Sequence, residues 1–203
     1  MLDFLQGTVG ERLSVDTYRE DYEKRFAASG SHESWKLERK QQFRQPRHAS
    51  WEAFARGDWD EALRLIEDRR QHLYELSKED AARGITLFRV RVAEEPIIPY
   101  LQWELHSLRL RAECGEKIRV VGPEQVVKFE DVGQLPELLT VGLDTVYEIL
   151  YDTSGVLDGA IRFVDPDATA RCNNFIGQLY SNGEELSSYF DRRVAHLEPP
   201  QVV

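Results

Sequence analysis

The sequence predicts an α/β fold with a mixed sheet, in which a strand-helix-strand crossover is joined by a carboxyl-terminal hairpin and flanking helices. Residues 85–92 form an apolar run rich in β-branched side chains, which fit a pleated surface. A helical pattern follows over residues 98–114, and Gly115 supplies the stop. A second apolar run covers residues 118–121. A strand, a crossover helix and a second strand explain this order most simply.

The region before this unit, residues 1–84, is predicted to be mainly helical and to pack on an α/β core of residues 85–195 as one compact unit. Ser14 as a cap and Asp16 in the first turn predict a helix that ends at Ala28. Residues 34–43 are interpreted as a strand with one apolar face, which Pro46 ends.

Residues 48–83 predict two helices, a short one through Trp51 and Phe54 and a long one that begins at Asp58. The long helix has one mostly apolar stripe and a charged opposite side. The stripe consists of Trp59, Leu63, Ile66, Leu73, Ser77 and Ala81. At 1.5 Å per residue this helix would be about 39 Å long, so we expect it either to bracket the sheet or to project toward a partner.

Beyond the crossover, residues 123–136 have the composition of an acidic loop, and residues 138–163 are interpreted as strands. Residues 145–151 and 156–164 form the arms of a hairpin around a turn at 152–155. Asp165 followed by Pro166 predicts a helix start. Apolar residues then continue at helical spacing to Phe190, with an interruption at residues 181–183.

Composition favours a soluble globular protein. The chain has 203 residues, of which 41% are hydrophobic and 31% charged. Its two cysteines have no metal-ligand spacing and no secretory leader is evident, so we expect a cytoplasmic protein without a metal or other cofactor and without a membrane segment. The formal charge of −10 argues against nucleic acid as a partner, because phosphates would be repelled.

Arginines in the crossover strands are the strongest candidates for a binding site. Arg89 and Arg91 share one face of the first strand because side chains alternate, and Arg119 on the next strand is expected to join them. Three guanidinium groups could hold a small anion through bidentate contacts. The alternative is that they pair with nearby acids on a solvated face, among them Glu94, Glu95, Glu104 and Asp144.

Tyr100, Glu104 and Asp144 complete the candidate ligand-binding set. Tyr100 and Glu104 are one helical turn apart and share a face of the crossover helix. Asp144 belongs to an acidic hairpin that could in principle bind a divalent cation, although the alternation and turn positions of its acids favour ordinary solvation. No known hydrolase, nucleotide-binding or phosphate-loop motif is present, so we assign no catalytic or metal-binding residue.

A second candidate surface is the basic run at residues 36–47. It holds five basic residues and one acid, with Trp35 and Phe43 nearby. Basic residues interleaved with aromatic ones suggest nucleic-acid binding. A charged edge strand that resists aggregation is the other interpretation.

Several short motifs, in order, resemble the uncharacterised actinobacterial family known as domain of unknown function 6879. They are Leu37-Glu38 followed by Phe43, Arg89-Val90-Arg91-Val92, Glu95-Pro96, Tyr100-Leu101 with Glu104, Gly115 to Arg119, Leu143-Asp144 and the turn at residues 152–155 with Gly159. The resemblance runs from about residue 35 to residue 179. The chain departs from the family at residues 141–148, where members often carry an Asn-His pair.

The resemblance implies a regulatory role. Members tend to be encoded beside helix-turn-helix regulators, and the element order is similar to one half of a phospholipase-D-like domain without its catalytic His and Lys. We therefore expect a non-enzymatic regulatory or ligand-sensing protein that binds a protein partner, such as a helix-turn-helix transcription regulator, or a small anion. The alternative is an enzyme acting on a nucleotide or phosphodiester through its arginines, Tyr100 and Glu104.

Overall fold

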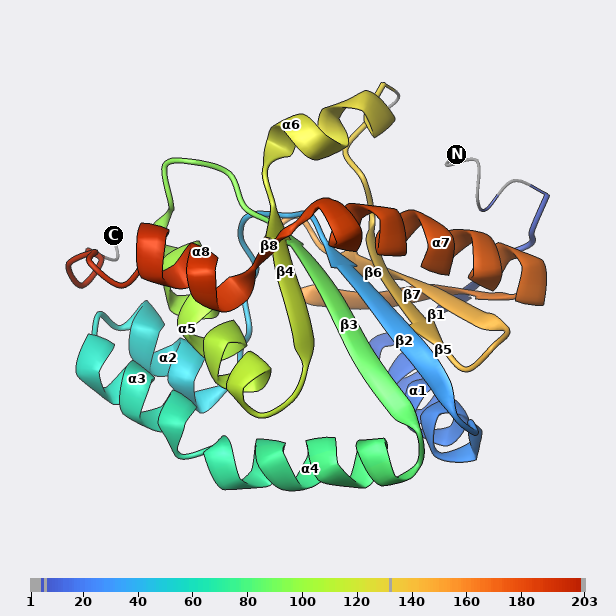
Figure 1. Ribbon diagram of the computed structural model, residues 1–203, viewed down its shortest axis with the longest axis horizontal. Helices are drawn as coiled ribbons and strands as arrows, with labels where there is room; N and C mark the ends of the chain where they lie inside the picture. The colour runs from blue at the N-terminus through green and yellow to red at the C-terminus, as the bar shows by residue number, and fades with distance from the viewer. Residues whose placement is uncertain (1–4, 6, 132, 202–203) are drawn as a thin grey trace.

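The computed structural model describes residues 5, 7–131 and 133–201 (Figure 1). In chain order the elements are β1 (Glu11–Leu13), α1 (Val15–Ala28), β2 (His32–Glu38), α2 (Ala49–Ala55), α3 (Trp59–Glu67), α4 (Arg70–Ala82), β3 (Ile85–Val92), α5 (Pro99–Glu113), β4 (Lys117–Val121), α6 (Pro123–Val126), a 3₁₀ turn (Val127–Phe129), β5 (Glu137–Val141), β6 (Thr145–Tyr151), β7 (Leu157–Val164), α7 (Pro166–Asn182), β8 (Glu184–Glu185) and α8 (Leu186–Arg193).

The predicted α/β class and the crossover are confirmed. Within the described residues, eight strands form one sheet in the order β1-β7-β6-β5-β2-β3-β4-β8. β3 pairs in parallel with β4, and α5 connects them. β2 pairs in parallel with β3, whereas β5, β6 and β7 follow one another in antiparallel pairs. The sheet is therefore mixed, with its parallel part at β2, β3 and β4.

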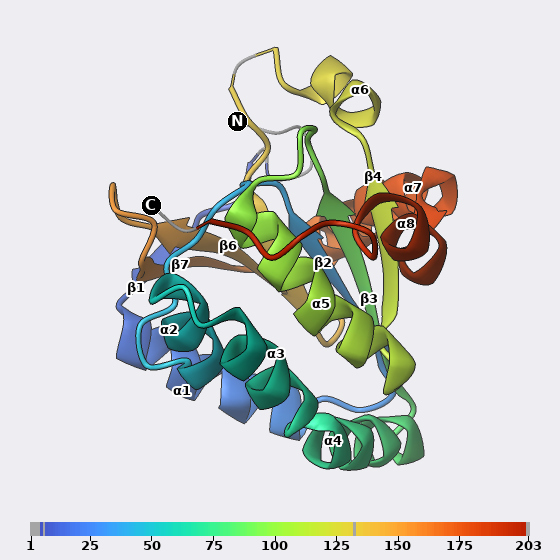
Figure 2. The same ribbon diagram turned by 90° about the vertical axis from the view of Figure 1, so that its left-hand side faces the viewer.

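Helices cover both faces of the sheet (Figures 1 and 2). α7 packs across β2, β3, β4, β5 and β6 on one face, over a core that includes Leu37, Val90 and Ile176. On the other face α1 covers β5 and β7, while α5 and α8 cover β4. α4 lies along the amino-terminal end of β3, between α1 and α5 (Figure 2).

The carboxyl-terminal hairpin is also confirmed. β6 and β7 pair antiparallel around the predicted turn, where the Asp152 carboxylate accepts the N–H groups of Ser154 and Val156. Asp165 caps α7 by accepting from the N–H of Ala168, and Pro166 occupies the first turn. The interruption expected near residue 182 separates α7 from α8.

The amino-terminal region contributes more to the sheet than its sequence predicts. β2 lies between β3 and β5, so it is a central strand and not a charged edge strand. It ends at Glu38, five residues before the predicted strand end at Phe43. A division at residue 84 consequently does not separate a helical layer from the α/β core, because β1 and β2 both belong to the sheet.

The predicted long helix from Asp58 is wrong. It is divided into α3 and α4 at Asp68 and Arg69, a turn without proline or glycine. α3 packs on α2 and α5, whereas α4 packs on β3 and the end of α5. One straight helix could not follow both surfaces, so tertiary packing overrides a continuous helical pattern. Among the described helices, none combines the length and the apolar character needed to cross a membrane.

Candidate ligand-binding site

Two of the three predicted arginines share a face of the sheet. Arg89 and Arg91 point to the side of α5, opposite the side on which Val90 packs against α7. In the register of β3 and β4, Arg119 lies beside Val90 and therefore points to the α7 side. Its guanidinium donates to the Tyr180 carbonyl and to Glu185. The expected set of three arginines is thus divided between the two faces.

Arg91 is completely buried between the sheet and α5. Its Nε donates to Glu104 Oε2 at 2.7 Å, and its Nη1 donates to the backbone carbonyls of Glu38 and Val92. Tyr100 donates its hydroxyl proton to Glu104 Oε1 at 3.1 Å. The predicted proximity of Arg91, Tyr100 and Glu104 is therefore present, in the interior and not on a solvated face.

Arg89 forms a second buried ion-pair group beside the first. Its Nη1 donates to Glu38 Oε2 at 2.8 Å and its Nε donates to Glu116 Oε1 at 2.6 Å. Lys36 lies 2.6 Å from the other Glu38 oxygen. Three cationic side chains on adjacent strands are thus balanced by carboxylates from β2, α5 and the turn after α5, which leaves the arginines no free charge for an external anion.

The acids of this network differ in their proton affinities. Burial opposes ionisation of each of them, but Arg89 and Lys36 hold the pKa of Glu38 well below its usual range, and Arg89 likewise lowers that of Glu116. Burial instead raises the pKa of Glu104 despite its contact with Arg91. Burial also raises the pKa of Glu137 to about 7.

Asp144 does not join the arginines. It lies in the turn between β5 and β6, where its carboxylate accepts the Thr145 hydroxyl and its carbonyl accepts the N–H of Asp165. Of the other acids expected near the arginines, Glu94 pairs with Arg39 and Glu95 with Arg193. These contacts explain the acidic residues as turn and surface structure.

The basic run at residues 36–47 does not form a continuous patch. The Arg39 guanidinium is buried and pairs with Glu94 and Glu130. Trp35 stacks on Phe88 beneath α7, and the buried Phe43 contacts Tyr100 and Tyr151. These two aromatic rings are therefore not available to stack on nucleic-acid bases.

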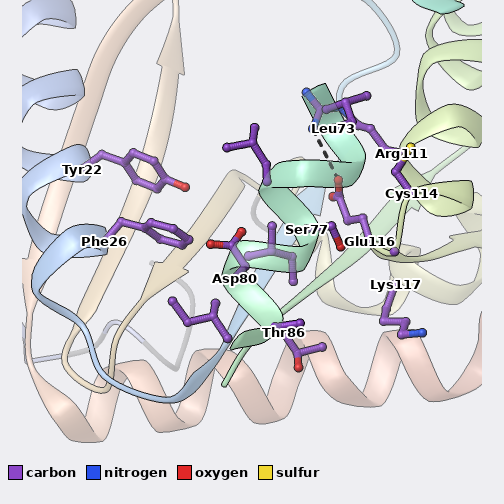
Figure 3. Close-up of a pocket in the computed structure, with 15 residues that line it drawn as sticks. Tyr22, Phe26, Leu73, Ser77, Asp80, Thr86, Arg111, Cys114, Glu116 and Lys117 are labelled. Carbon is purple, nitrogen blue, oxygen red and sulfur yellow. Dashed lines mark hydrogen bonds and ion pairs between the residues drawn. The ribbon is translucent and has the colours of Figure 1, made fainter. Parts of the chain in front are cut away.

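A hollow lies between α1 and α4, at the amino-terminal end of β3 (Figure 3). It has a volume of about 510 Å³, which is within the range of small-molecule sites. Its lining residues are Tyr22, Phe26, Leu73, Leu76, Ser77, Asp80, Ala81, Ile85, Thr86, Leu87, Arg111, Cys114, Gly115, Glu116 and Lys117. We call it the α1–α4 cavity.

The α1–α4 cavity combines an apolar body with a few polar groups. Leu73, Ile85 and Leu87 supply apolar surface, and Tyr22 and Phe26 project from α1 (Figure 3). Such a lining resembles that of small-molecule pockets, in which a few polar groups fix the orientation of a mostly apolar ligand. The cavity also touches the ion-pair network, because Glu116 lines it and accepts from Arg89.

The polar groups of the cavity have fewer and longer contacts than the side chains of the Arg89 and Arg91 ion-pair network. In Figure 3 the Glu116 carboxylate contacts Arg111 on one wall, at 3.5 Å. On the other wall the Asp80 carboxylate has a single cationic neighbour within 4.0 Å among the described residues, Arg83 Nη1 at that distance. The Ser77 hydroxyl has no hydrogen-bond partner within the described chain.

Sequence reasoning missed this cavity. Leu73, Ser77 and Ala81 do belong to the predicted stripe of the long helix, and they all line the cavity. The small residues Ser77 and Ala81 in that stripe were the sequence signal for a hollow beside the helix. The break after α3, which turns the stripe of α4 toward α1, could not be predicted from the sequence. Within the described residues, no group of three or more His, Cys, Asp or Glu side chains could hold a metal ion.

Comparison with known proteins identifies one family. The model of a family described as a domain of unknown function, DUF6879, matches residues 20–191. This range covers all of the sheet except β1, and it covers the α1–α4 cavity. No curated protein matches the chain.

Proposed function

The chain belongs to the DUF6879 family, whose description assigns no activity, and we propose that it is a non-enzymatic, ligand-sensing regulatory protein. The ligand is a small molecule that enters the α1–α4 cavity. The observation that carries this proposal is a hollow of about 510 Å³ with an apolar lining and incompletely paired polar groups. An anion held by Arg89 and Arg91 is not proposed, because both guanidinium groups are buried and paired with carboxylates.

A regulatory role requires that ligand binding in the cavity alter a surface that contacts another protein. α4 is suited to this because it lines the cavity through Leu73 and Ser77 and exposes Tyr74 to solvent. The partner expected from the family resemblance, a helix-turn-helix transcription regulator, remains part of the proposal. A pulldown that recovers no transcription regulator, with or without a cavity ligand, would contradict this part.

Blocking the cavity tests the proposal. Ala81 is exposed at the cavity wall, so Ala81→Phe fills the opening without replacing a core residue. Ala82→Phe is the matched control, because Ala82 is also exposed and does not line the cavity. We expect 3-methylindole, a neutral apolar probe, to raise the Tm of the wild-type chain and of Ala82→Phe but not of Ala81→Phe. An equal response of all three chains would refute the cavity as the binding site.

The enzyme alternative has one observation in its favour. Around Arg91 the pKa of Glu38 is lowered and that of Glu104 raised, a separation that acid-base catalysis uses. However, the side chains of this group are buried, and Tyr100 is 3% exposed. The resemblance to half of a phospholipase-D-like domain comes without the catalytic motif.

Tyr100→Phe separates the enzyme from the binding protein, because it removes one hydroxyl and keeps the ring. The enzyme alternative predicts that turnover of a phosphodiester substrate is lost, whereas we expect no turnover in either chain and unchanged binding of 3-methylindole.

A cytoplasmic location also stays a prediction. Both cysteines are free and buried, as a reducing compartment allows.

A further inference from the structure

Of the two carboxylates that line the α1–α4 cavity, that of Asp80 is the less compensated. Its closest cation among the described residues is Arg83, at the 4.0 Å limit of an ion pair. The Arg83 guanidinium is already engaged, since its Nη2 donates to the carbonyls of Phe26, Ala27 and Ser29 at the end of α1. Burial raises the pKa of Asp80 more than Arg83 lowers it, as expected for an acid without a close counter-ion.

Groups around Asp80 add acceptors and aromatic surface. Tyr22 and Phe26 stack at 5.6 Å between ring centroids and face the side of the cavity on which Asp80 lies (Figure 3). Ser77, three residues earlier on α4, turns its hydroxyl the other way, toward Gly115 and Glu116 (Figure 3). The Tyr22 hydroxyl has no hydrogen-bond partner within the described chain. A carboxylate, a hydroxyl and aromatic rings together favour a cation.

The carboxylate on the opposite wall, that of Glu116, has close cationic partners. Glu116 accepts from Arg89 at 2.6 Å and from Arg111 at 3.5 Å, so a carboxylate stands between two guanidinium groups. Lys117 is exposed at the rim, where water screens its charge. Other titratable groups near Asp80 are Glu79, on its own helix, and His32, on β2. Of the two carboxylates in the cavity, Asp80 is therefore the one that lacks a close cationic partner.

We propose that the α1–α4 cavity binds an organic cation, an ammonium group carried on an apolar or aromatic body, with the ammonium at Asp80 and the body against Leu73, Ile85 and Leu87. This inference rests on the proposed function and names its ligand class. The ammonium donates to the Asp80 carboxylate and to the hydroxyl of Tyr22. The apolar body gains from leaving water, at about 25 cal/mol per Å² of buried surface.

Three probes with one aromatic body and different charge test the proposal by isothermal titration calorimetry. They are tryptamine, which is a cation at pH 7, neutral 3-methylindole and anionic indole-3-propionate. We expect tryptamine to bind at least tenfold more tightly than indole-3-propionate, with 3-methylindole between them. Tenfold corresponds to about 1.4 kcal/mol, a modest value for one partly buried charge pair.

Asp80→Asn should remove this preference while it keeps the size of the side chain. Glu79→Gln is the matched control, because it removes the same charge from the neighbouring, exposed position on α4. We expect tryptamine to lose about tenfold in affinity on Asp80→Asn, no change on Glu79→Gln, and unchanged 3-methylindole binding to both. Retained far-ultraviolet circular dichroism and Tm show that each variant is folded.

The outcomes separate the inference from the function on which it rests. Equal binding of the three probes, or an equal effect of Asp80→Asn and Glu79→Gln, overturns the proposal that the ligand is a cation held at Asp80. The cavity would still be a ligand-binding site. Tighter binding of indole-3-propionate overturns it in favour of Arg111 and Lys117. No binding of any probe overturns both.

Discussion

Arg91 is a charged side chain without solvent exposure, and its partners come from three elements. Its Nε donates a hydrogen bond to Glu104 of α5, and its Nη1 donates to the carbonyls of Glu38 and Val92. Its Nη2 has no protein partner within the described residues. A buried pair of this kind adds little net stability against an apolar equivalent, but losing one member leaves the other uncompensated. The pair consequently fixes how α5 sits on the sheet.

Arg91→Ala is therefore expected to be far more damaging than removal of a surface arginine. Loss of one partner of a buried pair costs about 3–5 kcal/mol, because Glu104 must then be protonated or remain unpaired. Arg109→Ala, which breaks an exposed pair with Glu113 on the same helix, should cost about 0–1 kcal/mol. Urea denaturation measures both. A similar small loss for the two variants would contradict a structural role for Arg91.

Glu137 should make stability depend on pH. Its Oε1 accepts the N–H groups of Arg39 and Lys40, while Oε2 has no partner within the described residues. The pKa is about 7 in the folded chain against an ordinary 4.5. Between these values the folded state holds a proton that the unfolded state releases, so this residue's contribution to stability falls as pH rises.

Glu137→Gln, which imitates the protonated acid, removes this dependence. Relative to the wild type, the free energy of unfolding of the variant should increase from pH 4.5 to pH 7.5, by roughly 3 kcal/mol. Denaturation across this range supplies the comparison, with Glu148→Gln as a control for loss of a less buried acid. A difference that stays constant with pH would show that Glu137 is ionised in the folded chain.

The shared face of Arg89 and Arg91 could be predicted from the sequence, because alternation in a strand follows from backbone geometry. Pairing of the arginines with nearby acids, Glu104 among them, was also predicted, as the alternative to an anion-binding site. The position of Arg119 could not be, since the register between β3 and β4 depends on where the chain returns after α5. Burial of the arginines also escaped prediction, because their acidic partner Glu38 comes from a strand whose place in the sheet was unknown.

Elements with local signals were predicted well, and those decided by tertiary packing were not. α1, α7 and the β6–β7 hairpin have caps and turn residues that are visible in the sequence. The break between α3 and α4 has no such signal, because it arises from two different packing surfaces. The α1–α4 cavity depends on this break and so was equally hidden.

Gly159 marks how β1 is attached to the sheet. It has a φ of 111°, and a Cβ there would clash with the carbonyl oxygen of Leu13 in β1. Gly57 also has a positive φ, of 80°, but a Cβ there would meet no atom within 4 Å. Gly57→Ala should therefore cost only the backbone term of about 1–2 kcal/mol.

Gly159→Ala should cost this backbone term and about 1–3 kcal/mol more for the steric clash. Hydrogen exchange should show loss of protection in β1 together with the lower stability. If the two alanine variants are equally stable, β1 is not held by close approach to Gly159.

At the scale of the whole molecule, β2 joins the two halves of the sheet. It pairs with β3 on one side and with β5 on the other, so residues 32–38 belong to the same core as residues 85–164. The α/β class followed from the sequence because the crossover is local. The strand order did not, since β2 and β5 are brought together by the fold and not by neighbouring positions in the chain.

A fragment of residues 85–195 is accordingly expected not to fold alone. It would lack β2, which covers the edges of β3 and β5, and it would leave Arg89 without Glu38. Urea denaturation of the full chain should show one cooperative transition, and the fragment should show none. A cooperative transition in the fragment would instead support residue 84 as a domain boundary.

The proposed ligand lies in the α1–α4 cavity, and the buried arginines Arg89 and Arg91 have a structural role. A titration of the ¹⁵N-labelled chain with 3-methylindole, followed residue by residue by nuclear magnetic resonance, tests this most directly. We predict saturable amide shifts at Tyr22, Ser77, Asp80 and Gly115, and none at Arg91 or Glu104. Saturable shifts centred on Arg91 and Glu104, or no saturable shift at all, would contradict the account.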